Sequence, residues 1–260
     1  MTKTTKRIAS IITAIAIMLS VMCIAGATTA SAATDKVSLY STGVQFEKYG
    51  TKVYHIYIKT TGNASDESVF IHFNDGHNIN TPDGWDDHEA EFVTTLSDGS
   101  KIWKVAHTCI TSYSYNISFS YAIKYVADGV TYWDNNNGNN YNGTEALGVA
   151  PITVRRRSDI SYDYDNFPIF ALLQNYAYNK NVFVRFTTDG WDTYTDVPLS
   201  YSETNDDGTE LWTAYIDASG IRTNGYHLDK FEYAVCYQVN GQEYWANNFG
   251  ENYDINYRLY

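Results

Sequence analysis

The chain of 260 residues contains six Trp, 24 Tyr and 11 Phe, and 30 acidic residues outnumber 18 basic ones, giving a net charge of −12. This shortage of cations argues against nucleic acid or an anionic membrane surface as the main partner, because clustered Lys and Arg bind both. With 44% hydrophobic residues and a mean hydropathy of −0.37, the composition is that of a soluble folded protein rather than a disordered one.

The first 32 residues have the pattern of a secretory signal peptide. Lys3, Lys6 and Arg7 precede an apolar run over residues 8–24, and Ala30-Ser-Ala32 has the small-x-small form of a cleavage site. An uncleaved membrane anchor is the alternative, although the run is short and interrupted by polar residues. We therefore predict a secreted, extracellular, monomeric protein with no membrane segment in its mature form.

The rest of the chain contains an internal repeat. Three pairs of segments correspond, namely residues 69–85 with 182–191, 102–105 with 211–214, and 132–141 with 244–253, and together they hold all six Trp. Such a repeat indicates two copies of one module. We predict a first module at 33–154, a linker at 155–158 that contains three consecutive Arg, and a second module at 159–260.

Each copy consists of short runs of Val, Ile, Tyr, Phe and Thr separated by Asp-Gly and Asn-Gly turns. This pattern predicts an all-β fold of two tandem antiparallel β-sandwich modules. Asp128-Gly129 and Asn240-Gly241 favour two-residue type I′ turns, which fix the hairpin register. The register places Trp133 opposite Lys124, and Trp245 on the same polar face as Gln238 and Glu243.

The six Trp therefore divide into two groups. Trp103 and Trp212 alternate with polar neighbours inside apolar strands and are predicted to be core residues. Trp85 and Trp191 follow Asp-Gly in polar loops, and Trp133 and Trp245 lie on polar faces. Exposed rings beside many Asn and Tyr side chains suit carbohydrate, because sugar C–H faces cover a ring while hydroxyl groups pair with amides and phenols.

The repeated strings resemble the starch- and glycogen-binding carbohydrate modules of family 21, found on fungal glucoamylase and on glycogen-targeting subunits of protein phosphatase 1. The carriers are the Asp-Gly-Trp segments and the Trp-x-Asn-Asn-x-Gly-x-Asn-Tyr strings that begin at Trp133 and Trp245. The resemblance implies immunoglobulin-like sandwiches that bind α-1,4-glucans such as starch, glycogen and maltooligosaccharides. It implies sugar contacts by Trp85, Trp133, Asn136, Tyr141, Trp191, Trp245, Asn248 and Tyr253, with Tyr178 as a second-site tyrosine.

Two other functions stay open. A small glycosidase would need a pair of carboxylates at a fixed separation, but no acidic pair recurs between the copies, so we expect no enzyme. An extracellular adhesion or scaffold protein would use ring-rich patches to bind another protein. Extracellular amylolytic enzymes or a surface complex are the candidate protein partners.

Metal and disulfide chemistry are not indicated by the sequence. The histidines between residues 72 and 88 fit no compact zinc spacing and are absent from the second copy, and a structural calcium at an acidic turn is the weaker alternative. Cys109 and Cys236 are expected to be unpaired buried thiols. We therefore predict no cofactor and no metal site.

Overall fold

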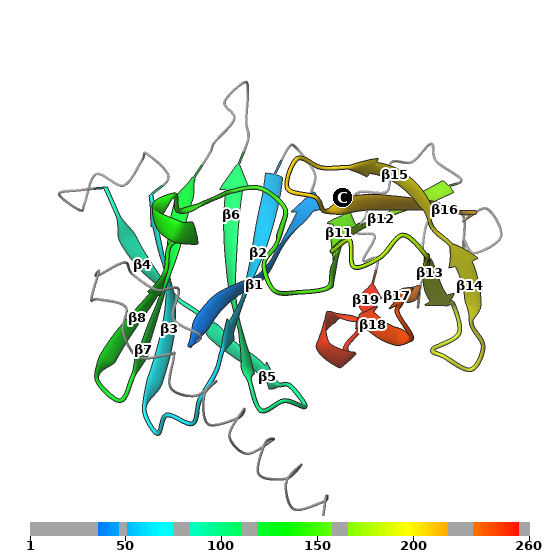
Figure 1. Cartoon of the computed structure of the whole chain (residues 1–260). Coiled ribbons are helices and arrows are strands. Elements are labelled where there is room, and N and C mark those ends of the chain that lie inside the picture. The colour runs from blue at the N-terminus through cyan, green and yellow to red at the C-terminus, as the bar shows by residue number, and fades with distance from the viewer. Residues whose placement is uncertain are drawn as a thin grey trace, which may run out of the picture. The chain divides into compact units, whose positions relative to one another are not determined.

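The computed structural model describes residues 36–46, 51–74, 84–110, 119–157, 166–217 and 231–254. Within these ranges the regular elements are β-strands and two short 3-10 turns (Figure 1). The prediction of an all-β fold with antiparallel sheets is confirmed. The predicted signal peptide at residues 1–32 lies outside the described residues, and among the described residues no helix is long and apolar enough to span a membrane.

The largest sheet has nine strands in the order β15-β16-β12-β11-β1-β2-β6-β5, with β10 beside β1. Its strands are β1 (Val37–Phe46), β2 (Thr51–Thr60), β5 (Glu91–Thr95), β6 (Lys101–Ile110), β10 (Ala146–Leu147), β11 (Ile152–Arg157), β12 (Asn166–Leu173), β15 (Ser200–Thr204) and β16 (Glu210–Asp217). All neighbours are antiparallel except β1 and β11, which pair in parallel.

Two further sheets have five strands each and the same order. The first contains β4 (Asp86–Glu89), β3 (Glu67–Asn74), β7 (Ser120–Ala127) and β8 (Val130–Asp134), with β9 (Tyr141–Asn142) beside β7. The second contains β14 (Thr195–Pro198), β13 (Lys180–Thr187), β17 (Glu232–Val239) and β18 (Gln242–Ala246), with β19 (Tyr253–Asp254) beside β17. The 3-10 turns η2 (Asn136–Gly138) and η3 (Asn248–Gly250) follow β8 and β18.

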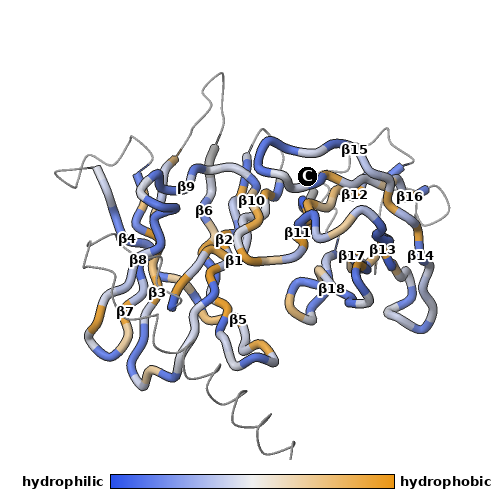
Figure 2. Tube along the Cα trace, viewed as in Figure 1, coloured by the Kyte–Doolittle hydropathy of each residue, from blue (hydrophilic) through white to orange (hydrophobic). Residues whose placement is uncertain are grey.

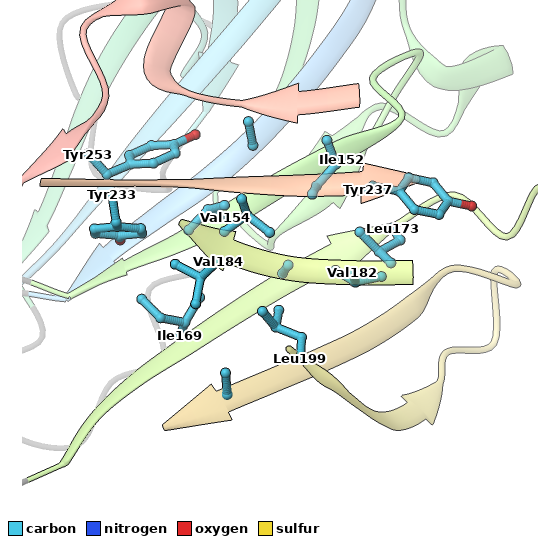
Figure 3. Close-up of a cluster of buried hydrophobic side chains, with 14 of the residues drawn as sticks. Ile152, Val154, Ile169, Leu173, Val182, Val184, Leu199, Tyr233, Tyr237 and Tyr253 are labelled. Atoms are coloured by element: carbon cyan, nitrogen blue, oxygen red, sulfur yellow. The ribbon is translucent and has the colours of Figure 1, made fainter. Parts of the chain in front are cut away.

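The buried side chains form two separate clusters, which divide the described chain into a first half (residues 36–147) and a second half (residues 152–254). In the first half, Ile56 and Ile58 of β2 pack with Ile71 of β3 and Ile123 of β7, and all four are completely buried. In the second half, β11, β12 and β16 supply one side of the core, and β13 and β17 the other (Figure 3). Each fully buried aliphatic side chain contributes about 1.5–3 kcal/mol.

The hairpin registers are those the turns predict. Lys124 pairs with Trp133, and Cys236 pairs with Trp245. Asp128 and Gly129 have φ of 48° and 79°, and the second turn, Asn240-Gly241, has 52° and 74°. Positive φ at both central positions is the type I′ geometry, which matches the twist of paired strands.

The segment between the halves differs from the predicted linker. Arg155, the first of the three arginines, is half-buried in β11 and bonds Glu145 through its guanidinium group. Strand β11 pairs with β12 and with the end of β1, and Ile152 and Val154 belong to the core of the second half. A run predicted to end the first module therefore starts the second half as a strand, in which Ile152 and Val154 alternate with Thr153 and Arg155. Residue 158 lies outside the described residues.

Candidate functional site

The outer faces of the two five-stranded sheets carry the exposed indoles. On β8 the Trp133 side chain is 37% exposed, and on β18 the Trp245 side chain is 36% exposed. Both lie in rows that cross three strands, Phe70–Lys124–Trp133 in the first half and Phe183–Cys236–Trp245 in the second. The structure thus presents one indole at the same sheet position twice, and we call each of these surfaces an indole face.

In the first half, His72 of β3 joins the two candidate tryptophans. Its ring stacks on Trp85 with centroids 5.0 Å apart and 14° between planes, and it meets the Trp133 ring edge-on at 5.6 Å. Trp85 and Trp133 are therefore brought together, although they lie 48 positions apart in the sequence. Residues 76–82, which lengthen the first copy before Trp85 relative to the second, lie outside the described residues.

A charged pair on the neighbouring strands holds this histidine. Asp87 of β4 lies 2.7 Å from Nδ1 of His72 through one carboxylate oxygen, and its other oxygen accepts from Nζ of Lys124 at 2.7 Å. Partial burial acts to raise the pKa of Asp87, but the hydrogen bonds from Lys124 and His72 outweigh it and hold that pKa below its ordinary value. The Lys124 ammonium also lies 6.0 Å from the centre of the Trp133 ring.

In the second half, Arg185 occupies the position of His72. Its guanidinium group makes two bonds to the carboxylate of Asp196, from Nε at 2.7 Å and from Nη2 at 2.8 Å. It also covers the Tyr194 ring at 4.0 Å and lies 5.4 Å from the Trp245 ring. Bonding to Asp196 raises the pKa of Arg185, so this group stays charged at every physiological pH.

Trp191 is fixed by its backbone and by its indole N–H. Its φ is 75°, a left-handed conformation that is unusual for a bulky residue, and its amide donates to Oγ1 of Thr187 at 3.0 Å. The indole N–H donates to Glu232 Oε2 at 2.7 Å, and Nδ2 of Asn252 approaches the same oxygen at 3.3 Å. Glu232 thereby links the Asp-Gly-Trp turn to the loop after β18.

The amide-rich loops are largely explained by backbone conformation. Asn136, Asn137 and Asn140 all have positive φ, as do Asn248 and Asn252 in the second half. Asn tolerates this conformation better than other non-Gly residues. Nδ2 of Asn136 donates to the carbonyl of Asn140 at 3.0 Å, so this predicted sugar-binding amide also closes its own loop. The trace after β8 is hydrophilic throughout (Figure 2).

The two tyrosines that end these loops, both predicted to contact sugar, pack against the cores. Tyr253 is only 9% exposed and packs against Tyr233 (Figure 3). Tyr141 is half-buried and is stacked on Tyr121. Its hydroxyl donates to the buried Asp134 at 2.7 Å, and burial and this bond raise its pKa. Tyr253 therefore offers little surface to a ligand, whereas Tyr141 remains partly exposed.

Tyr178 and the two cysteines complete the set of residues considered from the sequence. Tyr178 is 97% exposed in the loop between β12 and β13. In the first half, the corresponding Ser65 bonds Oδ1 of Asp128 through its hydroxyl, which stabilises the hairpin turn. Cys236 is a buried free thiol, and burial raises its pKa to about 12, so it is not reactive. Nothing is described of the Cys109 side chain.

Several residues of the site were not predicted from the sequence, and the list is His72, Asp87, Lys124, Phe183, Arg185, Tyr194, Asp196 and Glu232. His72 and Arg185 were detectable, because they occupy the same position in the repeated Val-Phe-x-x-Phe string and face the same side as the indoles. Glu232 had no such signal, since its counterpart at the same register in the first half is Ser120. Across the described ranges no group of three His, Cys, Asp or Glu is arranged to hold a metal ion.

Comparison with known proteins identifies one family. The sequence model of the carbohydrate/starch-binding module (family 21) matches residues 170–256. Protein phosphatase 1 regulatory subunit 3B of Bos taurus is 40% identical over 83 residues, which is 32% of this chain and 29% of the relative. Glycogen-binding subunit 76A of Drosophila melanogaster is 32% identical over 82 residues, 31% of this chain and 12% of the relative. The chain thus spans less than a third of the length of these relatives.

Among solved structures, the carbohydrate-binding module of the muscle glycogen-targeting subunit of protein phosphatase 1 is similar, with a TM-score of 0.34 and 19% identity. This match covers 43% of the chain and 78% of that structure.

The relatives overturn the predictions of a secreted protein and of an extracellular location. They are regulatory subunits of a phosphatase and a glycogen-binding subunit, and none of them is described as secreted. The expectation of a binding protein rather than an enzyme is confirmed, because the matched family is a binding module. The segment that matches the family model, residues 170–256, contains Trp191 and Trp245.

Proposed function

We propose that both halves of this chain bind α-1,4-glucans of the glycogen and starch type without cleaving them. One observation carries the proposal: an indole at the same register on the outer face of each five-stranded sheet, held by an acid-paired cation or imidazole. In the second half, the family match supports it directly. In the first half, the support is the repeated strand order and the repeated register.

The chemistry of the indole faces fits a neutral sugar. An exposed indole covers the C–H face of a glucose ring and removes about 50–80 Å² of apolar area from water, which contributes on the order of 1–2 kcal/mol per ring. The His72 ring is held by its bond to Asp87, and the Trp191 indole by its bond to Glu232. Side chains fixed in this way lose less conformational entropy when a ligand binds. Two rings and a few hydrogen bonds give a dissociation constant of the order of 0.1–1 mM for one half.

Two such sites on one chain increase attachment to a branched or long glucan. With an effective concentration of about 1 mM, the second contact adds roughly tenfold to a site of 0.1 mM affinity. We therefore expect firm retention on glycogen or granular starch although each half binds short oligosaccharides weakly.

A glycogen and starch co-sedimentation assay tests the proposal. We expect the protein to sediment with glycogen and with granular starch and to be released by maltoheptaose. It should not sediment with cellulose, and cello-oligosaccharides should not release it from starch. Retention on cellulose equal to that on starch, or no retention on any α-glucan, would contradict it. In the latter case the scaffold function predicted as an alternative would be favoured.

The protein partner is a separate part of the proposal. The relatives are regulatory subunits of protein phosphatase 1, which favours a phosphatase over the amylolytic enzymes predicted from the sequence. The shared segment is a glucan-binding one and covers 29% of that relative, so the partner needs its own test. Capture of purified phosphatase 1 catalytic subunit by the immobilised chain, compared with an α-amylase, distinguishes the two.

A further inference from the structure

A row of polar side chains crosses the indole face of the second half beside Trp245. Asn181 of β13, Gln238 of β17 and Glu243 of β18 occupy directly opposed positions on three neighbouring strands. The amide of Asn181 donates to Gln238 Oε1 at 2.8 Å, and the amide of Gln238 donates to Glu243 Oε1 at 2.6 Å. Each bond orients the next side chain, so the row is a pre-arranged set rather than three independent groups.

This polar row, defined by Asn181, Gln238 and Glu243, runs parallel to the aromatic row of Phe183 and Trp245. Side chains two positions apart on a strand share a face and lie roughly 6.6–7 Å apart. The Phe183 and Trp245 rings meet edge-on at 5.7 Å, so the aromatic row offers a continuous apolar strip. A glucan whose first ring lies on Trp245 and whose chain follows β18 would place its next unit above the polar row.

The donor and acceptor chemistry of the row suits vicinal hydroxyl groups. An amide has two N–H donors and an oxygen with two acceptor sites, and a carboxylate has two oxygens. The two hydrogen bonds within the row use one N–H of Asn181 and one of Gln238, which leaves further capacity for a ligand. The carboxylate of Glu243 disfavours an anionic ligand, so the chemistry selects a neutral polyhydroxylated chain.

The row also borders a surface hollow. Its walls include Asn179, Lys180 and the Asn240-Gly241 turn, together with all three residues of the row. The hollow therefore leads from the polar row to the loop that carries the exposed Tyr178. Side chains able to bond sugar hydroxyl groups therefore extend from Trp245 toward this loop.

We propose that the polar row is an extension subsite that binds the glucose unit beyond the one stacked on Trp245, so that the second half binds maltooligosaccharides more tightly than a single glucose unit. This inference rests on the proposed glucan-binding function. The first half provides the internal comparison, because the same three register positions hold Ser68, Val126 and Thr131 there. That half lacks the amide–amide–carboxylate row and should show no such length preference.

The test uses the full chain with Trp133→Ala, which leaves the second half to report binding. In this background the row is replaced by its first-half counterparts, Asn181→Ser, Gln238→Val and Glu243→Thr, residues that these strand positions already accept. We expect the affinity for maltoheptaose, measured by calorimetry, to fall about tenfold. The affinity for methyl α-D-glucoside, which contains a single glucose unit, should change less than twofold in an NMR titration. Circular dichroism and thermal unfolding check that the variant is folded.

The reciprocal variant keeps the proposal testable if the triple substitution unfolds the protein. In a Trp245→Ala background, Ser68→Asn, Val126→Gln and Thr131→Glu build the row into the first half, and the affinity for maltoheptaose should rise several-fold. Equal losses for maltoheptaose and methyl α-D-glucoside, or no loss for either, would overturn the subsite while leaving glucan binding intact. If the Trp133→Ala protein does not bind maltoheptaose, glucan binding by the second half fails, and the subsite fails with it.

Discussion

The two indole faces use the same backbone and different chemistry to hold the same ring. In the first half the imidazole of His72 contacts two indoles and bonds Asp87, which also accepts from Lys124. In the second half a permanent cation, Arg185, is locked to Asp196 by two bonds and covers Tyr194. Strand register thus sets the position of the indole on the sheet. The residue beside it, His72 on β3 or Arg185 on β13, sets which side chain contacts it.

The halves also differ at the residue that follows the exposed tryptophan. Asp134 is buried at the end of β8, where its carboxylate accepts from the Leu39 amide at 2.9 Å and from the Tyr141 hydroxyl. Ala246 occupies this position in the second half and makes no such bonds. The residue after the tryptophan of the repeated string therefore serves folding in one half and is replaced by alanine in the other.

The largest effect in this comparison should come from Asp134→Ala. Removing the carboxylate leaves the Leu39 amide and the Tyr141 hydroxyl without their acceptor, at a cost of about 2–3 kcal/mol. Hydrogen exchange should speed up in peptides of β1 and β9, while peptides of β11 and β19 keep their protection. Equal acceleration in both halves, or none, would contradict a role confined to the first half.

The second prediction concerns the link between Trp191 and its loop. Glu232→Ala removes the acceptor of the Trp191 indole N–H. The Trp191 ring is then free to move before binding, and its ordering by the ligand costs free energy. Affinity for maltoheptaose in the Trp133→Ala background should fall roughly fivefold to tenfold, about 1–1.4 kcal/mol. Ser120→Ala, at the same register in the first half, is the matched control and should leave affinity within twofold. A loss from both substitutions would point to sheet damage instead.

The smallest effect should come from the ion pair of the first half. The pKa of Asp87 is lowered in the folded protein, so its stabilising contribution is complete above its unfolded value near 3.8 and is lost as the pH falls through the folded value. Asp87→Asn should cost about 0.2–1 kcal/mol at pH 7, as partly exposed pairs do, and nothing in strong acid. Urea unfolding of both proteins at pH 7 and pH 2.5 checks this, and an undiminished difference at pH 2.5 would contradict it.

Much of the fold could be predicted because the signals were local. Two Asp-Gly or Asn-Gly turns set the registers, and the registers alone placed Trp133 and Trp245 on outer faces. The strand at Arg155 was not predicted, because the three arginines resemble a solvated linker and the paired residues of β1 lie 111 positions earlier. Pairing across such a distance leaves no local pattern.

The site was predicted in part, for a related reason. Tyr253 follows a loop of residues with positive φ, and the direction of the chain after that loop, not the alternation of the sequence, turns its ring into the core. The resemblance to a binding motif does not separate residues that contact sugar from residues that shape the loop. Arg185 was overlooked because a charged residue on a strand face is usually solvated, whereas here three aromatic rings and a carboxylate surround it.

The most direct test of glucan binding is calorimetry with glycogen and maltoheptaose on Trp133→Ala, Trp245→Ala and the double variant. Tyr215→Ala is the matched control, since that ring is 65% exposed on β16 of the opposite sheet. Each single variant should lose about tenfold in apparent affinity for glycogen, and the double variant should lose at least about 100-fold while the control stays unchanged. A double variant that binds glycogen as tightly as the unmodified chain would contradict the account.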